Sequence, residues 1–341
     1  MAPDVIREHP RGAAVRVGSS TIGWMKQFRF LADARAIVDG KTLAAEARRA
    51  EAMGYSVLVI PDHLIEQLAP VPAMATIAAA TERLRISAFV FNNDLRHPAV
   101  LAQDLASLDV LSEGRLEVAI GAGWNRPEYE AIGQPFEPQA VRAARLEETI
   151  AVLKGCFAAG PFSFRGEHYT ITDLDAYPKP VQRPHPPFFI GGGGRRTLSL
   201  AGREAQIAGL APRILADAEG NPRADPRSLT IAATEEKIGW VREAAGPRFA
   251  DIELNVYPSV TGITVTDHAH DEAAKVADRL RARTGLDVDP DELLESPHIF
   301  IGSIEGLTEK FRMLRERLGI SSIMVGEIDE LAPIVERLAG T

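Results

Sequence analysis

The sequence predicts one α/β domain, a (β/α)8 TIM barrel with insertions, and two observations support this prediction. Strand-like runs alternate with helical runs along the chain and reach eight of each, as such a barrel requires, whereas a doubly wound sheet normally has fewer strands. The length of 341 residues also suits one barrel, because α/β barrels often exceed about 250 residues. We expect an N-terminal arm over residues 1–27 and a single barrel over residues 28–341.

Each expected strand is a short apolar run, and the residues that follow it are candidates for the site because barrel active sites lie at the C-terminal ends of the strands. The eight runs are FRFLADA from residue 28, SVLVIPDH from 56, RLRISAFVFNN from 83, RLEVAIGAG from 115, PPFFIGGGG from 186, QIAGL from 206, IELNVYPSVTGITV from 252, with an extension, and SSIMVGE from 321.

Helical spacing of apolar residues, often ended by a glycine, marks the segments between strands. Two segments lack this spacing and are rich in proline, residues 160–187 and residues 211–228, so we expect two excursions from the barrel, the second a mobile insertion. Helices are expected over residues 41–55, 97–114, 139–157, 195–205, 234–246, 271–285, 306–319 and 330–340.

Composition excludes several classes of protein. Hydrophobic residues make up 45% and charged residues 25%, the balance of a soluble globular chain. The net charge is 38 − 47 = −9, which disfavours nucleic-acid binding. Cys156, the one cysteine, lies in a helical apolar pattern, so we expect a buried thiol, no disulfide and no cysteine zinc site. Without a long apolar run or a secretory signal, the sequence predicts a cytoplasmic protein that does not bind membranes.

The clearest candidate for a binding site is a run of four glycines, Gly191 to Gly194, that leads directly into Arg195 and a helix. Free amides at a helix N-terminus, the helix dipole and guanidinium groups together favour a bound phosphate. The alternative is a flexible loop with solvated arginines. The pattern matches neither a dinucleotide fingerprint nor an ATP-binding P-loop, so a mononucleotide-type phosphate fits better.

Aromatic and amide side chains follow the third and fourth strands. Phe89 and Trp124 offer flat apolar surfaces, and Asn92 can donate and accept in one plane, which together suit an aromatic heterocycle with polar edges. Phe89 fits equally well as a core residue of its strand. Two glycines, Gly121 and Gly123, precede Trp124 and allow close approach of the backbone.

A carboxylate and an imidazole, Asp62 and His63, directly follow the second strand. His63 is a candidate proton donor, because its pKa in water lies near neutrality, and Asp62 is the expected orienting partner. The alternative is that His63 is only a hydrogen-bonding fixture. Glu128, near the start of the next segment, is interpreted either as a site residue or as a cap of that segment.

Motifs for chemistry by the protein alone are missing. The sequence contains no H-E-x-x-H, no G-x-S-x-G elbow, no Ser-x-x-Lys and no lysine at the end of an interior strand, so we expect no metal site, no nucleophilic serine and no Schiff base. A bound cofactor would then supply the chemistry, and the protein would orient it.

Four blocks of the chain resemble the bacterial luciferase-like monooxygenase superfamily. They are AEARRAEAMGYSVLVIPDHL, LRHPAVLAQDLASLDVLSEGRLEVAIGAGWNRPEYEAIG, YPKPVQRPHPPFFIGGGGRRTLSLAGREA and GSIEGLTEKFRMLRERLGI. The blocks look most similar to the branch that uses the deazaflavin coenzyme F420. The resemblance implies a barrel with the flavin or deazaflavin ring across its mouth and the phosphate at the glycine loop.

Carried over to this sequence, the resemblance implies that Asp62 and His63 contact the ring or substrate. It also implies a bulge with a non-proline cis peptide at the end of the third strand. One position departs from the pattern: several deazaflavin dehydrogenases have a glutamate where this chain has Trp124. The implied cofactor contacts are Ala88, Phe89, Val90, Asn92, Gly121, Gly123, Trp124, Glu128, Gly191, Gly192, Gly193, Gly194 and Arg195.

Three functions follow as hypotheses. The leading one is an F420-dependent oxidoreductase that moves a hydride between ring carbon C5 and a small organic substrate; the resemblance implies this two-electron chemistry because a deazaflavin lacks the nitrogen that stabilises an oxygen adduct. The second is an FMN-dependent monooxygenase, which needs a separate reductase as partner. The third is a barrel that binds a flavin-like ligand without turnover. A homodimer is expected in each case.

Overall fold

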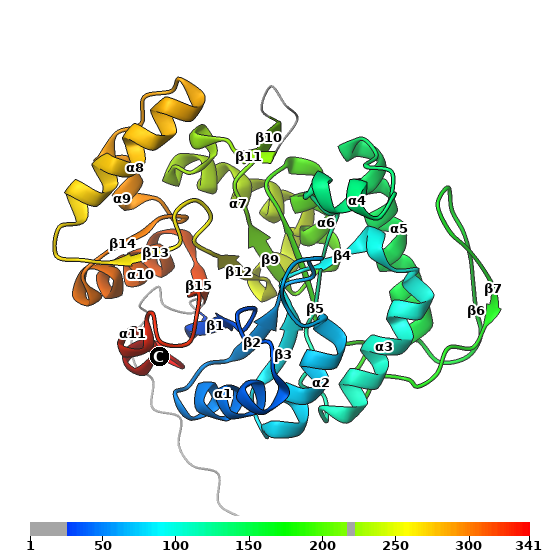
Figure 1. The fold of residues 1–341 in the computed structure, drawn as a ribbon. Helices are drawn as coiled ribbons and strands as arrows, with labels where there is room; N and C mark the ends of the chain where they lie inside the picture. The colour runs from blue at the N-terminus through cyan, green and yellow to red at the C-terminus, as the bar shows by residue number, and fades with distance from the viewer. Residues whose placement is uncertain (1–25, 217–221) are drawn as a thin grey trace, which may run out of the picture.

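The computed structural model describes residues 26–216 and 222–341. A ring of parallel strands lies at its centre and helices surround it (Figure 1). The predicted (β/α)8 barrel is confirmed, whereas the predicted arm over residues 1–27 falls outside the described residues except for its last two. The ring consists of β1 (Arg29–Asp33), β2 (Val57–Ile60), β3 (Arg85–Ala88), β4 (Phe91–Asn92), β5 (Val118–Gly121), β8 (Phe188–Gly192), β9 (Ile207–Leu210), β12 (Glu253–Val256) and β15 (Ile320–Met324).

Parallel pairing runs around the whole ring. The order is β3-β2-β1-β15-β12-β9-β8-β5-β4, and β3 and β4 are two parts of one strand interrupted at Phe89 and Val90. A bridge between Ile86 and Leu116 joins β3 to the entry of β5, so the ring is closed. All eight strand-like runs of the sequence therefore lie where they were expected, with β3 and β4 sharing one position.

Helices cover the outside of the ring (Figure 1). The helix expected over residues 139–157 is confirmed to the residue as α5. Among the outer helices α2 was missed, because its sequence PVPAMATIAAA is apolar on nearly every side and shows no helical period; the short helices over residues 126–131 and 290–295 were not predicted either. The outer helices are α1 (Gly40–Ala52), α2 (Pro70–Ala80), α3 (Pro98–Leu111), α5 (Gln139–Phe157), α6 (Arg195–Glu204), α7 (Ile231–Ala245), α10 (Ile304–Leu318) and α11 (Ala332–Leu338).

The two expected excursions contain regular structure that their sequences did not indicate. Residues 160–187 include an antiparallel hairpin, β6 (Phe162–Arg165) with β7 (Thr170–Leu174). The described part of residues 211–228 forms a second hairpin, β10 (Ile214–Ala216) with β11 (Pro222–Ala224). The expected extension of the seventh strand is a separate strand, β13 (Ile263–Val265), which pairs with β14 (Phe300–Gly302). Also present are α4 (Arg126–Ala131), α8 (Ala269–Thr284), α9 (Pro290–Glu295), η1 (Asn93–Leu95), η2 (Pro226–Ser228) and η3 (Gly246–Asp251).

Each barrel strand is buried on both faces, which explains the apolar runs in the sequence. In β2, Val57 and Val59 belong to the cluster inside the barrel, whereas Leu58 and Ile60 pack between the strands and the helices. Cys156 is buried in α5, as expected, and burial raises the pKa of its thiol.

Charged side chains gather at the N-terminal end of the barrel. Arg29 donates to both carboxylate oxygens of Glu253 at 2.9 Å, and Arg85 donates to Glu117 at 2.6 Å. Burial opposes the charge of Arg29, but the carboxylates of Glu117 and Glu253 outweigh it and raise the pKa of Arg29 above its ordinary value. This end of the barrel is thus filled by paired charges. No helix among the described residues is long and apolar enough to span a membrane.

Candidate active site

The C-terminal ends of the strands form a mouth opposite the charged end, and the predicted site residues gather there. They lie at or directly after four strand positions, β2, β3 with β4, β5 and β8, which are consecutive around the closed ring. Close-packed strand ends bring side chains from distant parts of the chain together.

His63 is held by a buried carboxylate. Its Nδ1 lies 2.9 Å from Oε1 and 3.0 Å from Oε2 of Glu128, and the Glu128 side chain is only 6% exposed. The ring of His63 also meets the edge of Trp124, with centroids 5.5 Å apart. Because a carboxylate only accepts hydrogen bonds, neutral His63 carries its proton on Nδ1 and keeps Nε2 as an acceptor.

Asp62 has a different partner from the one expected. Its Oδ2 accepts from Arg96 Nη1 at 2.6 Å and from the amide of Asn92 at 2.9 Å, and its Oδ1 accepts from Arg96 Nη2 at 3.0 Å. The bidentate ion pair joins the end of β2 to the segment after β4. Asp62 therefore fixes the rim of the mouth, and Glu128, not Asp62, is the carboxylate that contacts His63.

The strand break at Phe89 and Val90 has the form that the resemblance implied. The peptide bond between these residues is cis and neither residue is proline. Ala88 before it is buried at the end of β3. The Phe89 ring packs edge-on against Phe189 and Tyr257, each with centroids 5.5 Å away, at the top of the apolar cluster inside the barrel. Phe89 thus belongs to the floor of the mouth and to the core at once.

Asn92 is engaged in a buried polar network. Its Oδ1 lies 2.9 Å from the Tyr129 hydroxyl and accepts from the amide of Asp94 at 3.1 Å. Burial and the nearby Asp94 carboxylate raise the pKa of Tyr129 above its ordinary value. Gly123 has a φ of +73°, and a Cβ there would come within 2.0 Å of the Tyr129 hydroxyl oxygen. Gly123 therefore lets the backbone lie close to the Asn92–Tyr129 hydrogen-bond network of the protein itself.

Gly121 serves a similar purpose, because a Cβ at this position would come within 2.9 Å of a Val90 methyl carbon. Sequence reasoning missed Arg96 and Tyr129 as supports of the site. A buried acid implies a partner, but the spacing of residues along the chain does not show which one it is.

The glycine loop combines tight packing with free amides. A Cβ at Gly193 would come within 2.3 Å of the Pro212 carbonyl oxygen, so the loop lies directly against the backbone that follows β9. Gly194 is the N-cap of α6, has a φ of −115° and provides no side-chain cap. A Cβ at Gly194 would have Gln139 Nε2 as its nearest neighbour, at 4.0 Å, which is an ordinary van der Waals contact. The first turn of α6 therefore keeps the uncapped amides that favour an anion.

The arginines that follow the glycine loop have carboxylate partners on other helices. Arg195 pairs with Glu243 of α7 at 2.9 Å, with both side chains exposed, and Arg196 pairs with Glu147 of α5 at 3.2 Å. Arg213, which follows β9, is exposed, and its guanidinium makes no ion pair within the described residues. A Cβ at Gly193 would come within 2.9 Å of the Arg213 Cα, so the backbone of Arg213 lies directly against the glycine loop. Sequence reasoning missed Arg213, since only the fold brings it to the loop.

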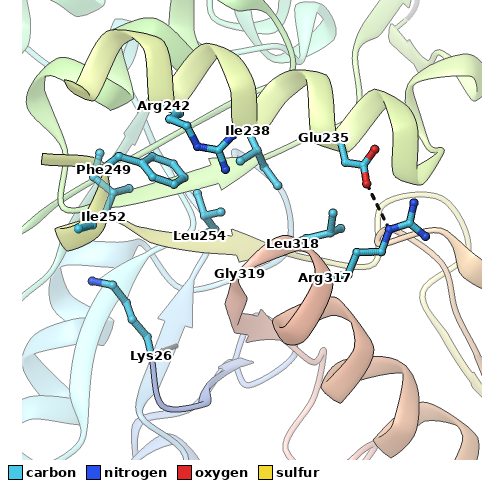
Figure 2. A pocket seen from close by; sticks show the side chains of 11 residues that line it. Lys26, Glu235, Ile238, Arg242, Phe249, Ile252, Leu254, Arg317, Leu318 and Gly319 are labelled. Carbon is cyan, nitrogen blue, oxygen red and sulfur yellow. Dashed lines mark hydrogen bonds and ion pairs between the residues drawn. The ribbon is translucent and has the colours of Figure 1, made fainter. Parts of the chain in front are cut away.

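A separate cavity lies away from the mouth. It has a volume of about 510 Å³ and lies between α7, α10 and the start of β12, near the N-terminal ends of the strands (Figure 2). Its walls are apolar at Phe249 and Leu254, and an ion pair of 3.2 Å between Glu235 and Arg317 crosses its edge. None of the predicted site residues lines it.

Known proteins resemble this chain in sequence. The family model of luciferase-like monooxygenases matches residues 21–312. The FMNH2-dependent dimethylsulfone monooxygenase of Pseudomonas putida is 39% identical over 127 residues, which are 37% of this chain and 35% of that relative. The F420-dependent glucose-6-phosphate dehydrogenase of Microbacterium testaceum is 32% identical over 165 residues, 46% of this chain and 48% of that protein. The chain thus matches half or less of the length of these relatives.

Solved structures share the fold. The coenzyme F420 dependent tetrahydromethanopterin reductase from Methanopyrus kandleri aligns with a TM-score of 0.71 at 17% identity, over 93% of this chain and 98% of that one. An F420-dependent secondary alcohol dehydrogenase aligns with a TM-score of 0.69 at 19% identity, over 92% of this chain and 98% of that one. The family model covers most of the sequence and confirms the resemblance that the sequence blocks indicated. The chain therefore belongs to the luciferase-like monooxygenase family.

Proposed function

We propose that this protein is an F420-dependent oxidoreductase that transfers a hydride between the deazaflavin and a small organic substrate. The observation that carries the proposal is His63 at the mouth of the barrel, held through Nδ1 by the buried Glu128. Two-electron transfer to or from a carbon–oxygen bond needs a group that takes or gives one proton. An oriented imidazole with a free Nε2 meets that need.

The residues at the mouth fit such a cofactor. The glycine loop and the uncapped start of α6 would hold its phosphate, and Phe89 with Trp124 would border the ring. Arg213 lies beside the loop without a carboxylate partner among the described residues. Coenzyme F420 carries further carboxylates beyond its phosphate, so this additional cation supports F420 over FMN.

The protein's own groups would divide the remaining work. When bound, the deazaflavin would supply or accept the hydride at C5. His63 would accept the hydroxyl proton when an alcohol is oxidised, or return it when a carbonyl is reduced. Each turnover would then move one hydride, which carries the two electrons, and one proton. The Asp62–Arg96 pair would keep the loop that carries His63 in place.

A second candidate is an FMN-dependent monooxygenase. The match at 39% identity to an FMNH2-dependent dimethylsulfone monooxygenase favours it, although that match covers 127 residues. In that case a separate reductase would supply the reduced flavin. A homodimer and a cytoplasmic location are part of the proposal in both cases.

The tautomer of His63 tests the contact on which the proposal rests. At pH 8 we expect the Nδ1–H form in the free protein, because the Glu128 carboxylate accepts from Nδ1. Long-range proton–nitrogen NMR of histidine-labelled protein reports this directly. Glu128→Ala should return His63 to the Nε2–H form that free histidine prefers. The exposed His268 serves as the reference in both samples, and an Nε2–H His63 in the unmodified protein would contradict the assignment.

Gly194→Asp tests the phosphate assignment. An aspartate here meets no steric barrier and caps α6 well, so the fold should be as stable as before or slightly more so. Its carboxylate would accept hydrogen bonds from the amides that are proposed to bind the phosphate. The affinity for the cofactor should therefore fall by at least about tenfold. Gly194→Ala, which adds the Cβ without the charge, is the control and should bind nearly normally. Equal affinities for the two variants in a fluorescence titration would refute the phosphate site.

Two arginine variants separate the roles of Arg213 and Arg195. We expect Arg213→Ala to weaken F420 binding by about tenfold, as for loss of one charged hydrogen bond at an exposed site. Arg195→Ala should change it by less than about twofold, because its guanidinium already pairs with Glu243. Calorimetric titration of both variants provides the measurement, and a larger loss for Arg195→Ala would reverse the assignment.

The function itself is tested with both cofactors. The protein is titrated with coenzyme F420 and with FMN, and hydride exchange is then followed with a panel of ketones, imines and secondary alcohols. We expect tighter binding of F420, measurable turnover, and a loss of about 100-fold in turnover for His63→Ala with little change in cofactor affinity. Tighter FMN binding with oxygen-dependent turnover would support the monooxygenase, and cofactor binding without any turnover would support the non-catalytic barrel.

A further inference from the structure

Exposed apolar side chains directly follow His63 and flank the helix that carries its partner Glu128. Leu64 and Ile65 follow His63 directly, and Trp124 and Ile132 flank α4, which follows β5, two strand positions away from β2. Each of the four side chains is about half exposed. The edge contact between His63 and Trp124 shows that the two loops meet. Large apolar residues gathered around a polar group mark a binding surface more often than a bare solvent face.

Three arginines on the side of the mouth that carries His63 are paired with aspartates that lie at or after the ends of strands. Arg35 donates to Asp33 at 2.6 Å. Arg96 donates to Asp62 at 2.6 Å, the bidentate pair described above. Each of these aspartates is buried. A cation that is already paired with a buried carboxylate offers little attraction to a further anion.

A third pair and two exposed acids strengthen this pattern. Arg145 donates to Asp94 at 2.8 Å. Glu66 and Glu130 are exposed on the same loops and add negative charge. Another exposed cation on these loops, Arg126, lies with its guanidinium over the Phe136 ring. The two glutamates outnumber it, so this side of the mouth combines apolar surface with an excess of negative charge, whereas Arg213, unpaired among the described residues, lies on the side of the glycine loop.

We propose that the substrate of this site is a neutral, mainly apolar alcohol whose hydroxyl donates to Nε2 of His63, and not a phosphorylated or carboxylated compound. The inference rests on the proposed function. The rim of Leu64, Ile65, Trp124 and Ile132 contacts the hydrocarbon part, and the single hydroxyl is placed at Nε2 of His63. A phosphate or carboxylate in the same position would lose its water and would set an acceptor against the acceptor Nε2 of neutral His63.

Three probes test the proposal on the full chain loaded with reduced coenzyme F420, so that an alcohol binds without being oxidised. Octan-2-ol is neutral and mainly apolar and has one hydroxyl donor, octanoate has the same chain length with a negative charge, and glucose 6-phosphate is polar and anionic. Calorimetric or NMR titration should show saturable binding of octan-2-ol, with octanoate at least tenfold weaker and glucose 6-phosphate weaker still. Binding of either anion as tight as that of octan-2-ol overturns the proposal.

A pair of lysine variants locates the binding surface. Leu64→Lys places a cation on the rim, and we expect it to weaken the binding of octan-2-ol at least fivefold and to tighten the binding of octanoate. Leu111→Lys is the matched control, because Leu111 is also more than half exposed but lies at the far end of α3, near the N-terminal end of the barrel. Identical ligand affinities for the two variants overturn the proposal.

Two further measurements distinguish substrate binding at the rim from contact between two copies of the chain and from loss of the cofactor. Light scattering of the unmodified protein and of Leu64→Lys reports whether the rim joins two copies, and a smaller mass for the variant overturns the proposal. Cofactor titration on the same samples reports on the proposed function. Failure to bind F420 or FMN overturns the proposed function together with this inference, whereas cofactor binding without octan-2-ol binding overturns this inference alone.

Discussion

Closure of the parallel ring is the constraint on which the rest of the structure depends. A parallel strand in a barrel is covered on both faces, so β2 needs valines inside and aliphatic residues outside, and neither face can accept a charge in mid-strand. Charges are therefore confined to the two ends. Paired arginines and glutamates fill the N-terminal end of the barrel. At the C-terminal end, Asp62, His63 and the glycine loop follow their strands and lie at one mouth.

Buried carboxylates and their hydrogen-bond partners determine the arrangement of the mouth. The Asp62–Arg96 pair neutralises the rim, and this leaves His63 to take its hydrogen-bond partner from Glu128 on a neighbouring loop. The same pairing neutralises Arg96 on the His63 side of the mouth, while Arg213 has no carboxylate partner among the described residues beside the glycine loop. This difference in charge between the two sides is the basis for proposing an anionic cofactor at one and a neutral ligand at the other.

Much of this could be predicted from the sequence, and the rest could not for physical reasons. Apolar runs and the glycine loop are local signals, so the eight strands and the N-terminus of α6 were found correctly. The helix α2 was missed because a segment that is apolar all round has no period. The partner of His63 was misassigned to the adjacent Asp62, because the contact with Glu128 joins residues 65 positions apart. Arg213 could not be predicted as a site residue, because only the fold brings it next to the glycine loop.

The central claim is that the cofactor occupies the mouth, and hydrogen–deuterium exchange with and without coenzyme F420 tests it most directly. The account predicts slower exchange at residues 192–198, in the first turn of α6, and at residues 121–128, which carry Trp124 and Glu128. Exchange at residues 235–254, around the separate cavity in Figure 2, should not change. Protection confined to residues 235–254, with none at the start of α6, would contradict the account.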